Sequence, residues 1–140
     1  MENEQGNIDI REELEFLESY INSSEKQITL LTQGIEDYGK ALSILQSKEI
    51  TQSSENLISL GGGVFARGRI DRESAVLVAI GSDIFIEEKP ESTIERLNAQ
   101  IDEVRKTLQN MNSQRTEALR RYEALVRAIN TSKKEDDPKR

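Results

Sequence analysis

Few residues in this chain have the types and spacing that catalysis requires. Its 140 residues include no histidine and no cysteine, which removes the commonest general base, the commonest transition-metal ligand and any thiolate nucleophile. The acidic pairs Glu12–Glu13 and Asp136–Asp137 could bind a divalent cation, but neither has the alternating ligand spacing of a calcium loop. We interpret both pairs as solvated surface, and we expect no catalytic residue, no metal ion, no cofactor and no enzyme activity.

Two further patterns could bind an anion. The run Gly61–Gly63 could cradle a phosphate, but no Gly-Lys-Ser/Thr sequence follows it and it leads into an apolar strand rather than a helix. A hairpin turn is the favoured interpretation, because glycine gives the backbone the freedom that tight turns need. Arg67 and Arg69 alternate on one face of a predicted strand, which favours a solvent-exposed face or an ion pair between subunits.

The stretch that organises the chain is residues 57–88. Four short apolar runs, at about 57–60, 64–70, 75–80 and 83–88, are separated by glycine or polar turns, which is the pattern of paired β-hairpins. Gly61–Gly63 supplies one tight turn, and Gly81–Ser82 supplies a two-residue turn for the other hairpin.

Two long helices are predicted on either side of the hairpins, at about 9–46 and 92–130. In both, apolar residues recur at alternating spacings of four and three residues, which is the heptad pattern of a coiled coil. Asp9 and, in the second helix, Ser92 followed by Glu95 resemble capping signals. Pro90 stops the last strand, and the charged residues 131–140 are expected to form a disordered tail.

The two heptad patterns fit each other in antiparallel register. The apolar heptad positions of the two helices face each other along a line that we call the seam. Ile21 falls opposite Ala118, their numbers sum to 139, and the other facing pairs of the seam share this sum. The polar exceptions, Ser24 and Arg115, also sum to 139 and so occupy one layer, which we interpret as a register marker while leaving a functional role open. The expected fold class is α+β: a single domain, residues 1–140, in which a long antiparallel coiled-coil hairpin carries two central β-hairpins.

Composition and charge exclude several classes of function. The net charge is −7, whereas a general nucleic-acid-binding protein shows a basic face. The charge is uneven, because residues 1–50 carry 11 acidic and 4 basic residues and residues 92–140 carry 8 and 11, so the two helices are expected to attract each other. No stretch has the roughly 20 apolar residues that span a membrane. The N-terminus lacks a signal-peptide core, and a cytosolic protein is expected.

The predicted strands are apolar on both faces, as the alternation of Val76 and Val78 with Leu77 shows. Such a sheet needs cover on both sides, which one chain cannot supply if its helices pair with each other, so we expect obligate oligomerisation through the strands. The candidate assembly residues are Leu57, Ile58, Leu60, Val64, Phe65, Ile70, Val76, Val78, Ile80, Ile84, Phe85 and Ile86.

The helix ends that carry the chain termini also have spare apolar residues. The second helix becomes more apolar beside its seam toward this end, which indicates either extra packing or a surface for binding exposed apolar chains. The candidate client-binding residues are Phe16, Tyr20, Leu119, Tyr122, Val126 and Ile129.

The order of helix, two glycine-turned hairpins and helix in about 140 residues resembles the α-class subunit of prefoldin, of the archaeal type (the prefoldin/GimC family). The similarity covers nearly the whole chain and is most specific in LISLGGGVFARGRI and AVLVAIGSDIFIEEKPESTIERL. Asp83 departs from it, since a second small residue is expected after Gly81.

The resemblance implies a cytoplasmic, ATP-independent holdase that captures non-native proteins and passes them to a group II chaperonin. It implies a hexamer of two α-class and four β-class subunits, whose strands form a barrel-like platform from which coiled coils hold clients at their tips. The alternative is a prefoldin-like structural adaptor that binds one specific folded partner.

Overall fold

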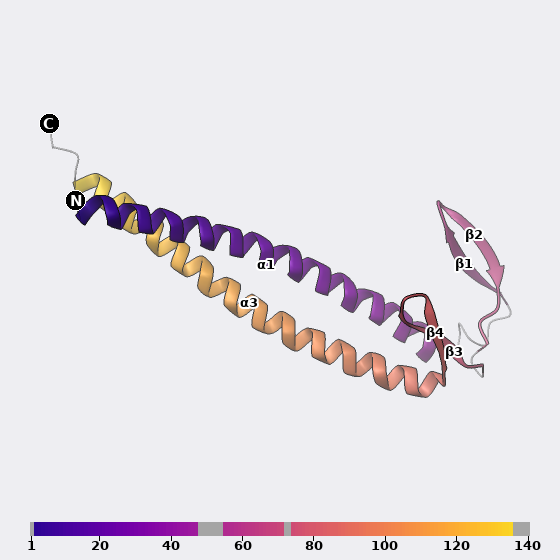
Figure 1. The fold of residues 1–140 in the computed structure, drawn as a ribbon. Helices are drawn as coiled ribbons and strands as arrows, with labels where there is room; N and C mark the ends of the chain where they lie inside the picture. The colour runs from indigo at the N-terminus through magenta and orange to yellow at the C-terminus, as the bar shows by residue number, and fades with distance from the viewer. Residues whose placement is uncertain (1, 48–54, 72–73, 136–140) are drawn as a thin grey trace. The chain divides into compact units, whose positions relative to one another are not determined.

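The computed structural model describes residues 2–47, 55–71 and 74–135, and Figure 1 shows its elements. Helix α1 (Glu2–Gln46) comes first and helix α3 (Pro90–Glu135) comes last. Between them lie the strands β1 (Asn56–Gly61), β2 (Val64–Gly68), β3 (Val76–Gly81) and β4 (Ile84–Glu88). The predicted order of helix, two hairpins and helix is confirmed.

Both helices are longer than the sequence patterns predict. Asp9, predicted as the cap of the first helix, lies inside α1, which already begins at Glu2. Carboxylates near a helix start, such as that of Glu4, interact favourably with the helix dipole and support this early beginning. At the other end of the chain, residues 131–135 of the predicted disordered tail are helical. Lys133 and Lys134 lie in the last turn of α3, where positive charge interacts favourably with the C-terminal end of the helix dipole. Residues 136–140 lie outside the described part.

The predicted cap of the second helix at Ser92 is wrong by three residues, because the residue that precedes the helix is Lys89. Helix α3 begins at Pro90, whose fixed φ suits the first helical position, where no backbone N–H is needed. The backbone N–H of Thr93 donates to the carbonyl oxygen of Lys89 over 3.0 Å, which closes the first turn. Ser92 is therefore already a helical residue.

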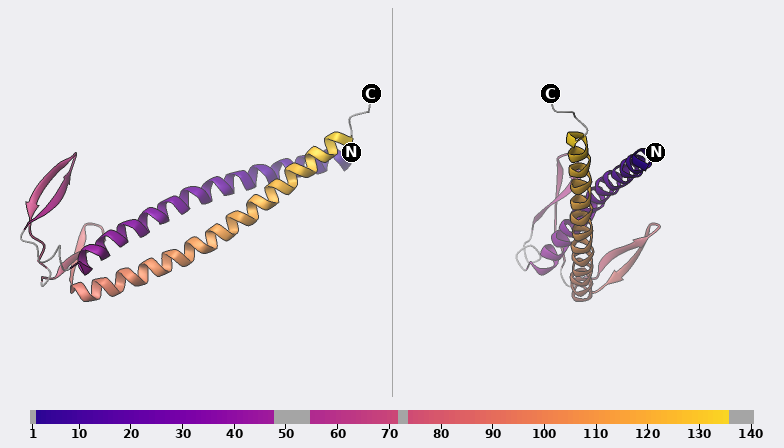
Figure 2. Two further views of the ribbon diagram at one scale, coloured as in Figure 1. Left: turned by 180° about the vertical axis from the view of Figure 1, so that it is seen from behind. Right: turned by 90° about the vertical axis from the view of Figure 1, so that its left-hand side faces the viewer.

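The chain divides into two compact units, and the described residues of the first are 2–32 and 106–135. In this terminal unit α1 and α3 run antiparallel, so that the beginning of α1 and the end of α3 lie at the same end (Figures 1 and 2). Ile21, Ala118 and Leu125 are buried between the helices, and Ser24 is buried with them. These are seam positions of the predicted heptads.

The second unit, residues 33–105, contains the rest of both helices and the four strands. In this central unit β1 pairs with β2 and β3 with β4, each as a separate antiparallel two-stranded sheet. Leu97 and Ile101 of α3 are buried here, with Thr93. A single domain over residues 1–140 stays a prediction.

The two hairpin turns have the same backbone form but different residues. Gly62 and Gly63 both have positive φ, the conformation of the tight turns that match the twist of a hairpin. In the other hairpin the central residues are Ser82 (φ 48°) and Asp83 (φ 59°), so the predicted turn at Gly81–Ser82 is displaced by one residue. Gly81, at φ 115°, is the last residue of β3, next to a register shift.

The second strand is shorter than predicted. Gly68 pairs with Asn56, the first residue of β1, so β2 ends there for lack of a partner further along. Ile70, proposed above as a strand residue of the assembly surface, and Arg69 therefore lie outside β2. Because Arg69 lies beyond the end of β2, it does not share a strand face with Arg67, as the predicted anion site would require. The guanidinium of Arg67 lies 3.5 Å from the carboxylate of Glu55.

Neither α1 nor α3, over the residues that the structure describes, is long and apolar enough to cross a membrane. Within the same residues, no group of three or more acidic, histidine or cysteine side chains is arranged to hold a metal ion.

Candidate functional site

The seam of the terminal unit is bordered by polar contacts that fix its register. The hydroxyl of Tyr20 donates to Gln114 Oε1 over 3.2 Å, and Arg121 Nε donates to Glu13 Oε1 over 2.7 Å. Tyr20 follows Glu13 by seven residues and Gln114 precedes Arg121 by seven, so these contacts are successive rungs on one flank of an antiparallel heptad pair. They agree with the register predicted from the sum of 139.

Charge also favours this pairing. Hydrogen bonding and charge attraction from Arg121 hold the pKa of the Glu13 carboxyl below its ordinary value of 4.5, although partial desolvation opposes the shift. The same contact raises the pKa of Arg121. The predicted attraction between the acidic start of α1 and the basic end of α3 is therefore present at this pair. Arg127, by contrast, pairs with Glu123 of its own helix.

The predicted client-binding residues differ in exposure. Phe16 is 68% exposed and Leu119 is exposed at 36%. The other four, Tyr20, Tyr122, Val126 and Ile129, are half-buried. Of these six residues, Phe16 and Leu119 are thus the two that are exposed while the helices stay paired, and the other four are partly covered.

These residues do not form one continuous surface. By helical periodicity, Phe16 and Tyr20 lie on the flank of the Glu13–Arg121 contact, whereas Leu119 and Val126 lie on the opposite flank. The remaining two, Tyr122 and Ile129, are seam positions between the flanks. The end of the helix pair therefore carries two separate apolar strips rather than one pocket.

In the terminal unit, two exposed apolar residues of α1 were missed by the sequence reasoning. Ile8 is 55% exposed and Leu30 is 66% exposed. Leu30 follows Phe16 by two heptads and so lies on the same outward face. The signal that could have found them is an apolar residue at a heptad position that normally meets solvent.

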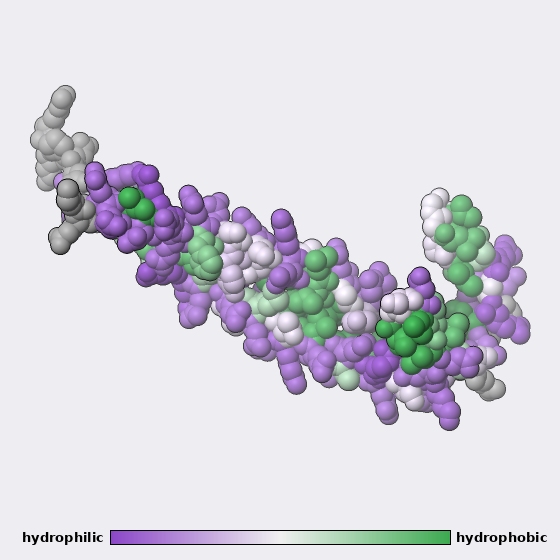
Figure 3. Space-filling model, viewed as in Figure 1, coloured by the Kyte–Doolittle hydropathy of each residue, from purple (hydrophilic) through white to green (hydrophobic). Residues whose placement is uncertain are grey.

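The hairpins expose a larger share of their apolar side chains than the helices do. Leu57 is 72% exposed and Leu77 is 68% exposed, although Leu77 was not among the predicted assembly residues. Figure 3 shows apolar side chains gathered on the hairpins, whereas hydrophilic side chains predominate along the helices around a smaller apolar patch midway. The exposed members of the predicted assembly set are Ile58, Leu60, Val64, Phe65, Ile80, Ile84, Phe85 and Ile86, together with Leu57. Val76, Val78 and Ile70 are half-buried.

An apolar groove of about 500 Å³ lies beside β3 within the central unit. It is lined by the run Val76–Ala79 of β3, by the end of α1 around Ile44, and by Leu97 of α3. Arg96 and Gln100 add polar groups to its wall. One face of β3 thus meets the helices incompletely, and the hairpin surface available for packing extends into this groove.

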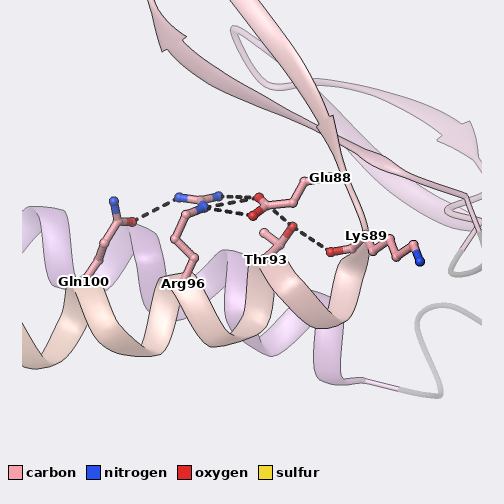
Figure 4. A network of polar contacts seen from close by, with 5 residues as sticks. All are labelled: Glu88, Lys89, Thr93, Arg96 and Gln100. Carbon is pink, nitrogen blue, oxygen red and sulfur yellow. Dashed lines mark hydrogen bonds and ion pairs between the residues drawn. The ribbon is translucent and has the colours of Figure 1, made fainter.

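A polar clamp joins β4 to the first turns of α3 (Figure 4). Arg96 Nη2 donates to Glu88 Oε2 over 3.0 Å, and the Thr93 hydroxyl lies 3.0 Å from the same oxygen. Arg96 also reaches Gln100 Oε1 over 3.3 Å. Hydrogen bonds from Arg96 and then Thr93 hold the pKa of Glu88 below its ordinary value of 4.5, against the effect of desolvation. The clamp thus ties the last residue of β4 to the first two turns of α3.

Known proteins of one family are similar to this chain in sequence and in fold. The family model described as "Prefoldin subunit" matches residues 17–135. The prefoldin subunit alpha of Thermoplasma volcanium is 42% identical over 91 residues, covering 65% of this chain and 70% of the relative. That of Thermoplasma acidophilum is 31% identical over 114 residues, covering 81% and 88%.

A solved structure has the same fold. A chain of the filamentous PFD of Methanocaldococcus jannaschii, determined by cryo-EM, matches 83% of this chain and 97% of its own length with a TM-score of 0.65. The two sequences are 18% identical, so this match concerns the fold alone. The family model and the relatives show that the chain belongs to the prefoldin family, as an α-class subunit. Members of this family are chaperones that act in protein folding and are not enzymes.

Proposed function

We propose that this subunit works in an ATP-independent holdase, which captures non-native proteins at the helix ends that carry the chain termini. The captured clients pass to a group II chaperonin in the cytoplasm. The hairpins assemble the subunit with β-class partners into a hexamer of two α-class and four β-class subunits, through a barrel-like platform. No catalytic residue, metal ion or cofactor takes part in this mechanism.

The observation that carries the proposal is an exposed apolar surface beside a seam that is already filled. Ile21, Ala118 and Leu125 are buried between the helices without help from Phe16 or Leu119. A holdase must bind many sequences weakly, which requires accessible apolar area rather than a shaped pocket. The two strips at the helix ends have that character, and Tyr122 and Ile129 would add to them where the last turns separate.

Assembly through the strands has separate support. A lone two-stranded hairpin is at best marginally stable in water, and its edges present unpaired backbone groups. Both hairpins of this chain carry large exposed apolar side chains, such as Leu57 and Leu77. Packing against neighbouring subunits would cover this area and stabilise the hairpins at the same time.

The test substitutes the two exposed members of the predicted client-binding set, as Phe16→Ser with Leu119→Ser. We expect the assembled complex to lose at least about half of its ability to suppress aggregation of a chemically denatured protein. Both side chains are exposed, so each of the two changes should alter helix stability by no more than about 0.5 kcal/mol. The measurements are light scattering of the diluted client and thermal melting followed by circular dichroism.

Leu30→Ser is the matched control, because Leu30 has nearly the same exposure as Phe16 and the same heptad position. It should leave aggregation suppression close to that of the unmodified chain. Equal losses in the control and in the double variant would overturn the assignment of client binding to the helix ends.

The choice of clients in this assay distinguishes a holdase from the alternative, an adaptor for one folded partner. A holdase suppresses aggregation of several unrelated denatured proteins, whereas an adaptor for one folded partner protects none of them. Failure with every client tested, in a complex that assembles normally, would favour the adaptor.

A further inference from the structure

One layer of the helix seam in the terminal unit is polar on both sides. Ser24 of α1 is buried, and Arg115 of α3 occupies the facing seam position. The Arg115 guanidinium leaves the seam at its edge, where Nη1 lies 3.8 Å from Glu25 Oε1. Arg115 Nε is buried, and it has no hydrogen-bond partner among the described residues. This layer is therefore an imperfect fit, unlike the apolar layers on either side.

The small Ser24 side chain is what makes the layer possible. A serine leaves room beside the seam for the stem of Arg115 to pass and for its charge to reach the edge and Glu25. A leucine in place of Ser24 would occupy that room. The pairing of the smallest seam residue of α1 with the longest seam residue of α3 thus depends on their being opposite each other.

Other registers of the same helices would lose this complementarity. A slip of one heptad, about 10 Å along the helix, would set Arg115 against Leu31 or Leu17, which the heptad pattern places at seam positions. The charge would then be buried against an apolar side chain, and Ser24 would leave a gap in a second layer.

We propose that Ser24, Arg115 and Glu25 form a register-determining layer, which selects one antiparallel alignment of α1 and α3 at the cost of local stability. Arg115 is a positioning residue: it decides which apolar side chains meet at the helix ends but does not itself need to touch a client. The correct alignment sets Leu17 opposite Tyr122 and Ile10 opposite Ile129, leaving neither end unmatched. This inference concerns the helix pair and holds whether or not the helix ends bind clients.

The absence of natural cysteines allows a direct test by disulfide trapping in the full-length chain. Leu17→Cys with Tyr122→Cys reports the observed register. Leu17→Cys with Ile129→Cys, and Ile10→Cys with Tyr122→Cys, report slips of one heptad in the two directions. A slipped pair lies about 10 Å further apart in the native register, which exceeds the reach of a disulfide.

Each pair is equilibrated in a glutathione redox buffer, and the cross-linked fraction is measured by gel shift and peptide mass spectrometry. In the natural seam, we expect the in-register pair to cross-link at least about tenfold more than either slipped pair. With Ser24→Leu and Arg115→Leu, the slipped pairs should gain at least about threefold. Arg115→Leu alone should give a smaller gain in the same direction.

Arg120→Leu is the control, since it removes the same charge from an exposed position of the same helix and should leave the cross-linking ratios unchanged. Circular dichroism of each variant verifies that the helices have formed. Slipped cross-links that stay at the natural level in the helical Ser24→Leu, Arg115→Leu variant would overturn the proposal. So would an equal gain in Arg120→Leu.

Discussion

The helix pair and the hairpins of this chain differ in how far their apolar side chains are buried. In the terminal unit the seam residues Ile21, Ala118 and Leu125 are covered by the facing helix of the same chain. In the hairpins Leu57, Leu77 and their neighbours remain largely exposed. The chain can therefore complete its coiled coil by itself, but its strands have surface to share with other subunits.

This difference indicates that separate segments of one sequence can provide stability and assembly: the helices pair within the chain, and the hairpins offer surface to other subunits. Heptad pairing within the chain makes the helices independent of partners. The hairpins, by contrast, gain most of their stabilisation when an apolar neighbour covers them. Changes in the strands should act on assembly, and changes in the seam should act on folding of the helix pair.

The largest effect is expected from Val78→Asp in β3. The change puts a charge at a half-buried strand position beside the apolar groove, where a packed neighbour would leave it unpaired at a cost of several kcal/mol, about 2 to 5. We expect the oligomer to be lost while helical circular dichroism is largely retained. Native mass spectrometry measures the assembly state.

Asn98→Asp adds the same charge at an exposed position of α3 and should leave assembly intact. If the Val78→Asp chain still runs as the full complex, the strands are not the assembly surface. The contrast between hairpins and helices would then lose its functional meaning.

A medium effect, of opposite sign, is expected from Arg115→Leu in the seam. It removes a buried Nε that has no partner in the described structure, and leaving such a group unsatisfied costs about 1 to 3 kcal/mol. The ion pair that is lost with Glu25 is long, at 3.8 Å, and partly exposed, so it offsets little of this gain. The melting temperature should rise, and a clear fall would mean that the layer stabilises the helix pair.

The smallest effect is expected from Glu88→Gln in the clamp between β4 and α3. The pKa of Glu88 is lowered in the folded chain, so its contribution to stability is complete above about pH 5 and is lost as pH falls through the lowered folded pKa. Glu88→Gln should therefore melt at a slightly lower temperature at pH 7, and the difference should shrink below pH 4. A difference that is the same at pH 7 and at pH 3.5 would contradict the role of the carboxylate charge.

The elements and their pairing could be predicted because they follow from periodic patterns. Heptads predict α1 and α3 together with their register, and glycine turns between apolar runs predict the two hairpins. The ends of the elements were predicted less well. Asp9 and Ser92 both match capping patterns, but both helices begin earlier, and at the second helix the reason is Pro90, whose fixed φ suits the first helical position. The end of β2 depends on where its partner strand β1 begins. The apolar character of Ile70 does not indicate that position.

The candidate surfaces were predicted only in part. Off-seam apolar residues pointed to Phe16 and Leu119, which the structure leaves exposed, but periodicity along one helix did not indicate that the end residues lie on two flanks. The Glu88–Arg96 clamp was missed because it joins a strand end to a helix two turns later through side-chain geometry. Client binding and hexamer formation stay predictions, because they depend on surfaces of other molecules.

The central claim, that the helix ends hold clients while the hairpins hold the complex together, is tested most directly by truncation. Residues 1–16 and 124–140 are removed together, and residues 136–140 alone are removed in a control chain. Assembly is measured by native mass spectrometry, and protection of two unrelated denatured proteins is measured by light scattering. We expect the doubly truncated chain to assemble but to lose most of its aggregation suppression, while the control keeps it. A doubly truncated complex that assembles and still protects both proteins as well as the full chain would contradict the account.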